Sequence, residues 1–134
     1  LDNIVLPAAE SKKSKESREE KQERGEQLMR KMGIIDIADN DINEVSGGQL
    51  QRACICRSMM NRPKLLFADE PTGALDSQSG AQIMELFQTL NDEGVTVVMI
   101  THDLDVANHT KRVLHIRDGQ FAEQHIPEKK EAEA

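Results

Sequence analysis

The chain has 134 residues, and its 17 lysines and arginines against 24 aspartates and glutamates give a formal net charge of −7. This length suits one domain with its own core, whereas the negative charge argues against a general nucleic-acid binder, which needs a basic face. Trp and Tyr are absent, so the chain also lacks most aromatic platforms for stacking bases. We therefore expect no nucleic-acid partner. Nor does any apolar run approach the about 20 residues of a membrane-spanning helix.

The first third of the chain is dense in charge. Residues 10–31 mix acidic and basic side chains at helical spacing, which predicts a solvated helix with Leu28 and Met32 as its apolar stripe. Gly33 is expected to end that helix, and residues 34–45 form a short turn region.

The second half of the chain alternates between helical and extended patterns. Residues 49–61 are expected to be helical, and the apolar run 65–68 is typical of a buried parallel strand. An amphipathic helix is predicted over residues 78–93, followed by a second buried, β-branched strand over 95–100. Strand, helix and strand in this order predict a βαβ unit.

Several residues mark the ends of these elements. Ser77 is a plausible N-cap of the helix over 78–93, and Gly94 is a plausible residue just beyond its end. Asp118 and Gly119 lie between two short extended runs, which predicts a hairpin. The two cysteines, Cys54 and Cys56, have no further zinc-ligating residues close to them in sequence, so we interpret them as reduced thiols.

The first segment that could bind a ligand is Ser46-Gly47-Gly48-Gln49. Ser46 and Gln49 fit the S-x-x-Q pattern of a capping box, which opens a helix and leaves backbone N–H groups at its start. Two glycines would let a phosphate approach this backbone closely. An ordinary helix cap explains the same residues equally well.

Two strand ends carry the other candidates. Asp69 and Glu70 follow the first strand, where an acid can hold Mg²⁺ or orient an attacking water; a charged strand end is the plain alternative. His102 follows the second strand and could hydrogen-bond a terminal phosphate. Lone histidines are usually structural or solvated, and that interpretation is given to the other three: His109, His115 and His125.

Together these motifs resemble the nucleotide-binding subunit of an ATP-binding-cassette (ABC) transporter. Residues 46–49 resemble the family signature, with Val45 where Leu is usual, and residues 65–70 resemble its Walker B strand and catalytic glutamate. The D-loop and H-loop are matched by residues 74–77 and 101–103. The sequence of residues 68–76 most resembles that of the exporter subfamily, which includes macrolide efflux, lipoprotein release and antimicrobial-peptide resistance systems.

The resemblance implies an α/β fold, a partial P-loop NTPase of the ABC ATPase type. None of the eight glycines is followed by Lys, so the chain has no P-loop, and the Q-loop glutamine is missing too. The chain is then expected to be the C-terminal part of such a subunit. Its expected parts are a helical, signature-bearing subdomain (1–62), the C-terminal half of the catalytic core ending in a hairpin (63–126), and a disordered tail (127–134).

By the same resemblance, two subunits would sandwich ATP. The expected nucleotide contacts come from the signature and the D-loop: Ser46, Gly47, Gly48, Gln49 and Asp76. Asp69 would serve Mg²⁺, while Glu70 would act on the hydrolytic water and His102 on the γ-phosphate.

The resemblance implies two partners, a second nucleotide-binding subunit and a membrane permease. The helical block around residues 10–45 would face the permease. The subunit would then be cytoplasmic and peripheral on the membrane, hydrolysing ATP to power export, although this chain alone is expected to be inactive. Two alternatives stay open: a soluble ABC ATPase outside transport, and a non-catalytic interaction fragment.

Without a P-loop strand beside it, the strand over 95–100 is expected to present an unpaired edge. The final hairpin, residues 112–123, would either move inward to cover that edge or leave it to a strand of a second chain.

Overall fold

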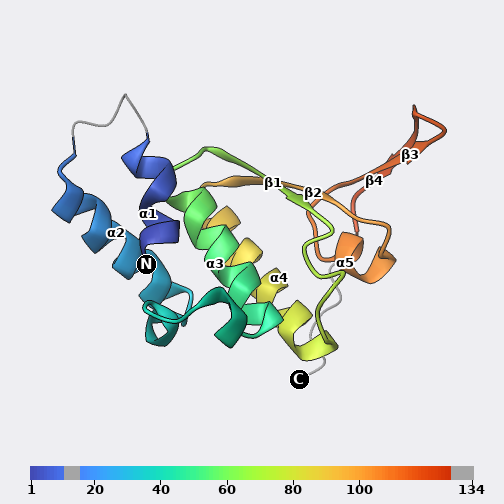
Figure 1. The fold of residues 1–134 in the computed structure, drawn as a ribbon. Helices are drawn as coiled ribbons and strands as arrows, with labels where there is room; N and C mark the ends of the chain where they lie inside the picture. Colours follow the sequence, from blue (N-terminus) through green and yellow to red (C-terminus); the bar gives the residue numbers. More distant parts are fainter. Residues whose placement is uncertain (11–15, 128–134) are drawn as a thin grey trace, which may run out of the picture.

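The computed structural model describes residues 1–10 and 16–127, so the expected tail lies almost wholly outside the described residues. In chain order its elements are α1 (Asp2–Ala9), α2 (Arg18–Lys31), η1 (Ile35–Ile37), η2 (Ile42–Glu44), α3 (Gly47–Met59), β1 (Leu65–Asp69), α4 (Ser77–Asp92), β2 (Thr96–Ile100), α5 (Leu104–Asn108), β3 (Val113–Arg117) and β4 (Gln120–His125) (Figure 1). No helix within the described ranges has both the length and the apolar character needed to cross a bilayer.

The charged helix of the sequence analysis is α2, and it starts later than expected. Ser17 forms a capping box with Glu20, in which each side chain accepts a hydrogen bond from the other residue's backbone N–H. At the other end, Gly33 adopts a φ of +65°, as its expected helix-ending role requires. Leu28 and Met32 both pack onto the hydrophobic core, which confirms the expected apolar stripe.

The predicted βαβ unit is present. β1 and β2 pair in parallel, with Leu65 opposite Thr96 and Asp69 opposite Ile100, and α4 connects them. Because parallel strands run in the same direction, the carboxyl ends of β1 and β2 lie side by side. This pairing places Glu70 and His102, which are far apart in sequence, next to each other.

The expectation that both strands are buried is only half right. Leu66 and Ala68 of β1 are buried, but Phe67 is 67% exposed and Ile100 of β2 is 56% exposed. Successive side chains of a strand point to opposite faces, and α4 covers one face, with Leu66 and Ala68 in its hydrophobic cluster. The apolar side chains on the other face are not covered by another element of the described chain. Exposed and more buried residues therefore alternate along the strands although most of the exposed residues are apolar.

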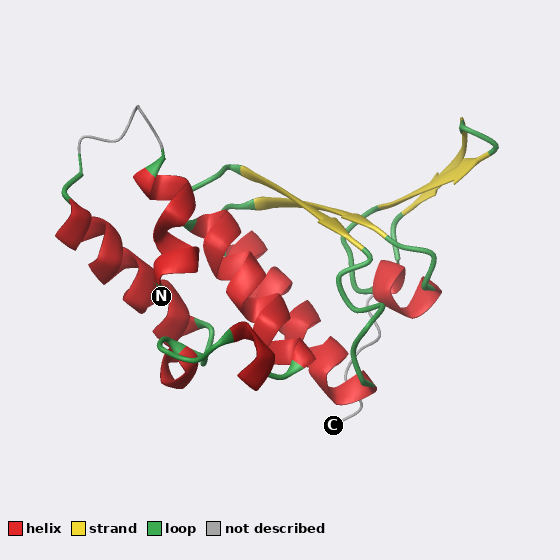
Figure 2. Cartoon of the chain, in the orientation of Figure 1, coloured by secondary structure: helices red, strands yellow, loops and turns green. Residues whose placement is uncertain are grey.

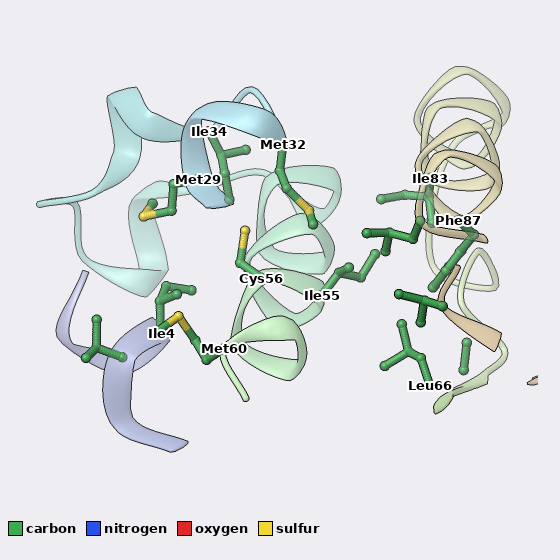
Figure 3. Packing of buried hydrophobic residues seen from close by; sticks show 14 of the residues in the cluster. Ile4, Met29, Met32, Ile34, Ile55, Cys56, Met60, Leu66, Ile83 and Phe87 are labelled. Carbon is green, nitrogen blue, oxygen red and sulfur yellow. The ribbon is translucent and has the colours of Figure 1, made fainter. Parts of the chain in front are cut away.

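One hydrophobic core joins the helical part to the βαβ unit (Figure 3). Its largest fully buried side chains come from α2, α3, α4 and the turns after α2 and α3: Met29, Ile34, Cys56, Met60, Ile83 and Leu90. Both cysteines are unpaired, as interpreted, and burial raises the pKa of the Cys56 thiol to about 12.

The hairpin is formed as predicted, but it does not cover the edge of β2. β3 and β4 pair antiparallel around Asp118 and Gly119, which both have positive φ. They form a separate two-stranded sheet that extends away from β1 and β2 (Figure 2). Within the described residues, β2 therefore pairs with β1 alone, and the inward shift of the hairpin was the wrong alternative.

Candidate functional site

The first group of candidate residues lies where β1 and β2 end. Glu70 follows directly after Asp69, and its N–H donates to the Ile100 carbonyl at 2.9 Å, so the pairing with β2 continues one residue past β1. The backbone of Glu70 has a φ of +44°, a left-handed conformation that is uncommon for a non-glycine residue. The turn after the strand thus fixes the position of this carboxylate.

The Glu70 carboxylate is held by the two residues that follow β2. Its Oε1 accepts from the His102 N–H at 2.9 Å and lies 2.6 Å from His102 Nδ1, while its Oε2 accepts from the Thr101 hydroxyl at 3.2 Å. The hydrogen bond from the His102 ring lowers the pKa of Glu70, and the same bond raises the pKa of His102. Sequence reasoning included Thr101 only as part of a motif and missed this role.

The arrangement leaves one imidazole nitrogen of His102 available. Since Nδ1 faces an accepting carboxylate, it carries a proton, and Nε2 is the nitrogen that can meet a ligand. The His102 side chain is 89% exposed, so a phosphate group could reach it. Glu70 and His102 therefore act as one hydrogen-bonded pair.

Asp69 supplies a second carboxylate beside this pair. It ends β1, and it is exposed. Carboxylate oxygen is the ligand type that Mg²⁺ prefers, so the residue fits the metal role expected from the sequence.

The second group is built on the start of α3. Ser46 is the N-cap: its hydroxyl accepts from the Gln49 N–H at 3.2 Å, and the Gln49 side-chain oxygen accepts from the Ser46 N–H at 2.9 Å. This confirms the predicted capping box. Gly47 and Gly48 are the first two helical residues, and N–H groups at these positions have no carbonyl one turn earlier in the helix to bond. They are free to meet an anion, at the positive end of the helix dipole.

The start of α4 packs against these glycines. A Cβ on Gly48 would lie 3.3 Å from the Ser79 hydroxyl oxygen, tighter than ordinary contact, so any other residue there would have to displace the Ser79 side chain slightly. Asp76 accepts from both the backbone N–H of Ser79 (2.9 Å) and its hydroxyl (2.7 Å), and these bonds lower the pKa of Asp76. The expected N-cap Ser77 was therefore wrong: Asp76 caps α4, because its carboxylate can accept both Ser79 hydrogen bonds.

The predicted site residues thus form two groups. Asp69, Glu70 and His102 meet at the strand ends, while the residues of the signature meet the segment around Asp76 at the starts of α3 and α4.

Comparison with known proteins places this arrangement in a family. The ABC transporter family matches residues 3–73, just over half of the chain. This chain belongs to the ABC transporter family. It is similar to the macrolide export ATP-binding/permease protein MacB of Nitrosomonas europaea, at 46% identity over 79% of the chain, and to that of Neisseria meningitidis, at 43% over 90%. The chain spans only 16% and 18% of the length of these two relatives.

Solved structures agree with this family. The ATP-binding cassette MJ0796, solved as a dimer in a post-hydrolysis state bound to ADP and Pi, matches with a TM-score of 0.80 at 35% identity over 95% of this chain and 56% of its own. CbiO1 of Clostridium perfringens, part of the ABC transporter complex cbiONQ, matches with a TM-score of 0.82 at 28% identity over 92% of this chain and 49% of its own. The fold is accordingly α/β and corresponds to about half of an ABC ATPase cassette.

Proposed function

We propose that this chain is the signature-bearing part of an ATP-hydrolysing subunit that powers export through a membrane permease. The observation that carries the proposal is the Glu70 carboxylate, fixed at a strand end by His102 and Thr101. A carboxylate held in this way can orient an attacking water, which is a main task of a protein in phosphoryl transfer. The names of the MacB relatives, which describe both export and ATP binding, support the same function.

Each predicted residue has a role in this proposal. Gly47 and Gly48 bind the γ-phosphate of an ATP held mainly by another subunit, through their amides at the start of α3. The Ser46 hydroxyl donates to the same phosphate, and Gln49 holds Ser46 in place through the capping box. Asp69 serves Mg²⁺, which when bound neutralises charge on the phosphate oxygens. Glu70 orients the hydrolytic water. His102, protonated on both ring nitrogens, donates from Nδ1 to Glu70 and from Nε2 to the γ-phosphate.

The proposed partners follow from the same arrangement. A second nucleotide-binding subunit completes each ATP site, and Asp76 couples the two sites because it fixes the start of α4 beside the signature. The helices before the signature face an integral membrane permease, which places the subunit peripherally at the cytoplasmic face of the membrane.

Replacing Glu70 by glutamine tests the proposal in a hybrid cassette, formed when residues 1–134 follow the P-loop-bearing part of a MacB relative. We expect ATP hydrolysis to fall by about 10²–10⁴-fold, because the water loses the carboxylate that orients it, while ATP binding is retained. Glu85→Gln is the matched control, since Glu85 is an exposed residue of α4. Unchanged hydrolysis in Glu70→Gln would contradict the assignment.

A second function, a non-catalytic interaction module, is favoured by the uncovered face of β1 and β2. The 134-residue chain has no P-loop to cradle the β- and γ-phosphates. We therefore expect calorimetry with Mg-ATP to show no micromolar binding to this chain alone. A clear micromolar isotherm would show that the residues present suffice for nucleotide binding.

A further inference from the structure

The hairpin gathers three metal-ligand side chains on one face. Glu123 of β4 lies directly opposite His115 of β3, and His125 lies two residues further along β4. Opposite residues of an antiparallel pair share a face, as do residues two apart on one strand. The register therefore places all three side chains on the same face of the hairpin.

An irregularity in this register falls directly beside the cluster. His115 pairs with Glu123 whereas Ile116 pairs with Phe121, so Ala122 has no cross-strand partner. Such bulges redirect neighbouring side chains and are common beside functional sites.

The distances within the cluster suit metal coordination. His115 Nε2 and His125 Nδ1 are 3.2 Å apart, and the ligand atoms of all three residues lie within 4.8 Å of one another. With bonds of about 2.0–2.1 Å, a tetrahedral zinc ion holds neighbouring ligand atoms about 3.3 Å apart, close to the separation of the two imidazole nitrogens. We propose that His115, Glu123 and His125 form a binding site for a borderline divalent metal ion of the zinc class.

The donor set decides which metal ions fit. Two imidazoles with one carboxylate suit Zn²⁺ and its transition-metal neighbours, whereas Mg²⁺ and Ca²⁺ prefer oxygen ligands alone. Three protein ligands leave at least one coordination position for water. His115 and His125 are half-buried and Glu123 is exposed, so an ion can enter from solvent.

A direct imidazole–imidazole hydrogen bond is the competing explanation for the contact of 3.2 Å. In that case one ring nitrogen donates and the other accepts, and the stacked rings, 5.1 Å between centroids, stay as they are. Such a hydrogen bond does not involve Glu123, whereas a metal ion would be bound by all three residues. The dependence of zinc binding on Glu123 therefore separates the two explanations.

Zinc titration of the 134-residue chain tests the proposal. We expect one zinc ion to bind with micromolar affinity, and His115→Gln, Glu123→Gln and His125→Gln each to weaken it by more than the about 10–100-fold that losing an outer-shell partner costs. His109→Gln is the matched control, because it removes one histidine from the end of α5. It should leave the affinity unchanged, and Mg²⁺ should not compete.

Nuclear magnetic resonance of the unaltered chain provides a test that does not depend on how the variants fold. Zinc should shift the His115 Nε2 and His125 Nδ1 resonances, whereas the ring nitrogens of His109 should not move. The proposal is overturned if no zinc binds at micromolar concentration, if Glu123→Gln leaves the zinc affinity unchanged, or if both histidine variants do. It is also overturned if only the ring nitrogens of His102 respond, because zinc would then occupy the Glu70–His102 pair.

Discussion

Replacing Ser46 by alanine removes the hydroxyl oxygen that accepts a hydrogen bond from the Gln49 N–H at 3.2 Å. The Gln49 side chain can still accept from the backbone of residue 46, so half of the capping box survives. Loss of a serine N-cap typically lowers the free energy of unfolding by about 1 kcal/mol, within a range of about 0.5–2. Because glycines are poor helix formers, the first turn of α3 depends strongly on its cap, and we expect a loss in the upper half of that range.

A matched control exists in the same chain. Ser17 caps α2 in a second capping box, and its hydroxyl accepts from the Glu20 N–H at 3.1 Å. Both variants should therefore lose stability, by about 3–5 °C in Tm for each kcal/mol. The loss should be smaller for Ser17→Ala, because the first turn of α2 contains no glycine. In a cassette that carries a P-loop, however, only Ser46→Ala should weaken ATP-driven pairing of the two subunits, since only Ser46 belongs to the proposed phosphate contact.

Urea unfolding followed by circular dichroism measures the first effect, and light scattering with ATP in the Glu70→Gln background measures the second. The reasoning is refuted if Ser46→Ala leaves the unfolding midpoint unchanged while Ser17→Ala lowers it, because Ser46 would then not cap α3. If both variants impair ATP-driven pairing equally, the effect comes from lost stability rather than from lost phosphate contact.

In the nucleotide-free chain, the raised pKa of His102 means that its proton is kept to higher pH, and the lowered pKa of Glu70 means that its charge is kept to lower pH. The ion pair therefore stabilises the fold between these two pKa values. Its contribution is lost as pH rises through the pKa of His102 or falls through the pKa of Glu70. Glu70→Gln should lower the His102 pKa in an NMR titration, and an unchanged pKa would contradict the contact. A thiol reagent at mildly alkaline pH should modify the exposed Cys54 quickly and the buried Cys56 only on unfolding, which mass spectrometry can follow; equal rates would show that Cys56 is accessible. The 134-residue chain should self-associate through the open edge and uncovered face of β2, and Val98→Lys should shift light scattering towards monomer; a monomeric unaltered chain at high concentration would disprove this.

Local rules explain which parts of the fold could be predicted from the sequence. A capping box needs only Ser46 and Gln49 three residues apart, and its two hydrogen bonds are found as expected. The cap of α4 was misplaced by one residue because Asp76 and Ser77 are both good N-cap residues. The hydrogen bonds of Asp76 to Ser79, which the sequence pattern does not display, decide between them.

The sequence by itself determined the order of the motifs, the capping box of α3, the hairpin turn at Asp118 and Gly119 and the parallel pairing of β1 with β2, because these depend on side-chain periodicity and short-range turn chemistry. Only the tertiary structure decided how residues distant in sequence meet. The Glu70–His102 contact spans 32 residues and requires the β1–β2 register, and the His115–His125 contact requires the register of β3 and β4. Tertiary packing also left Phe67 exposed although its segment is apolar. Burial depends on which elements cover a face, and an apolar strand whose second face meets no helix keeps half of its side chains in water.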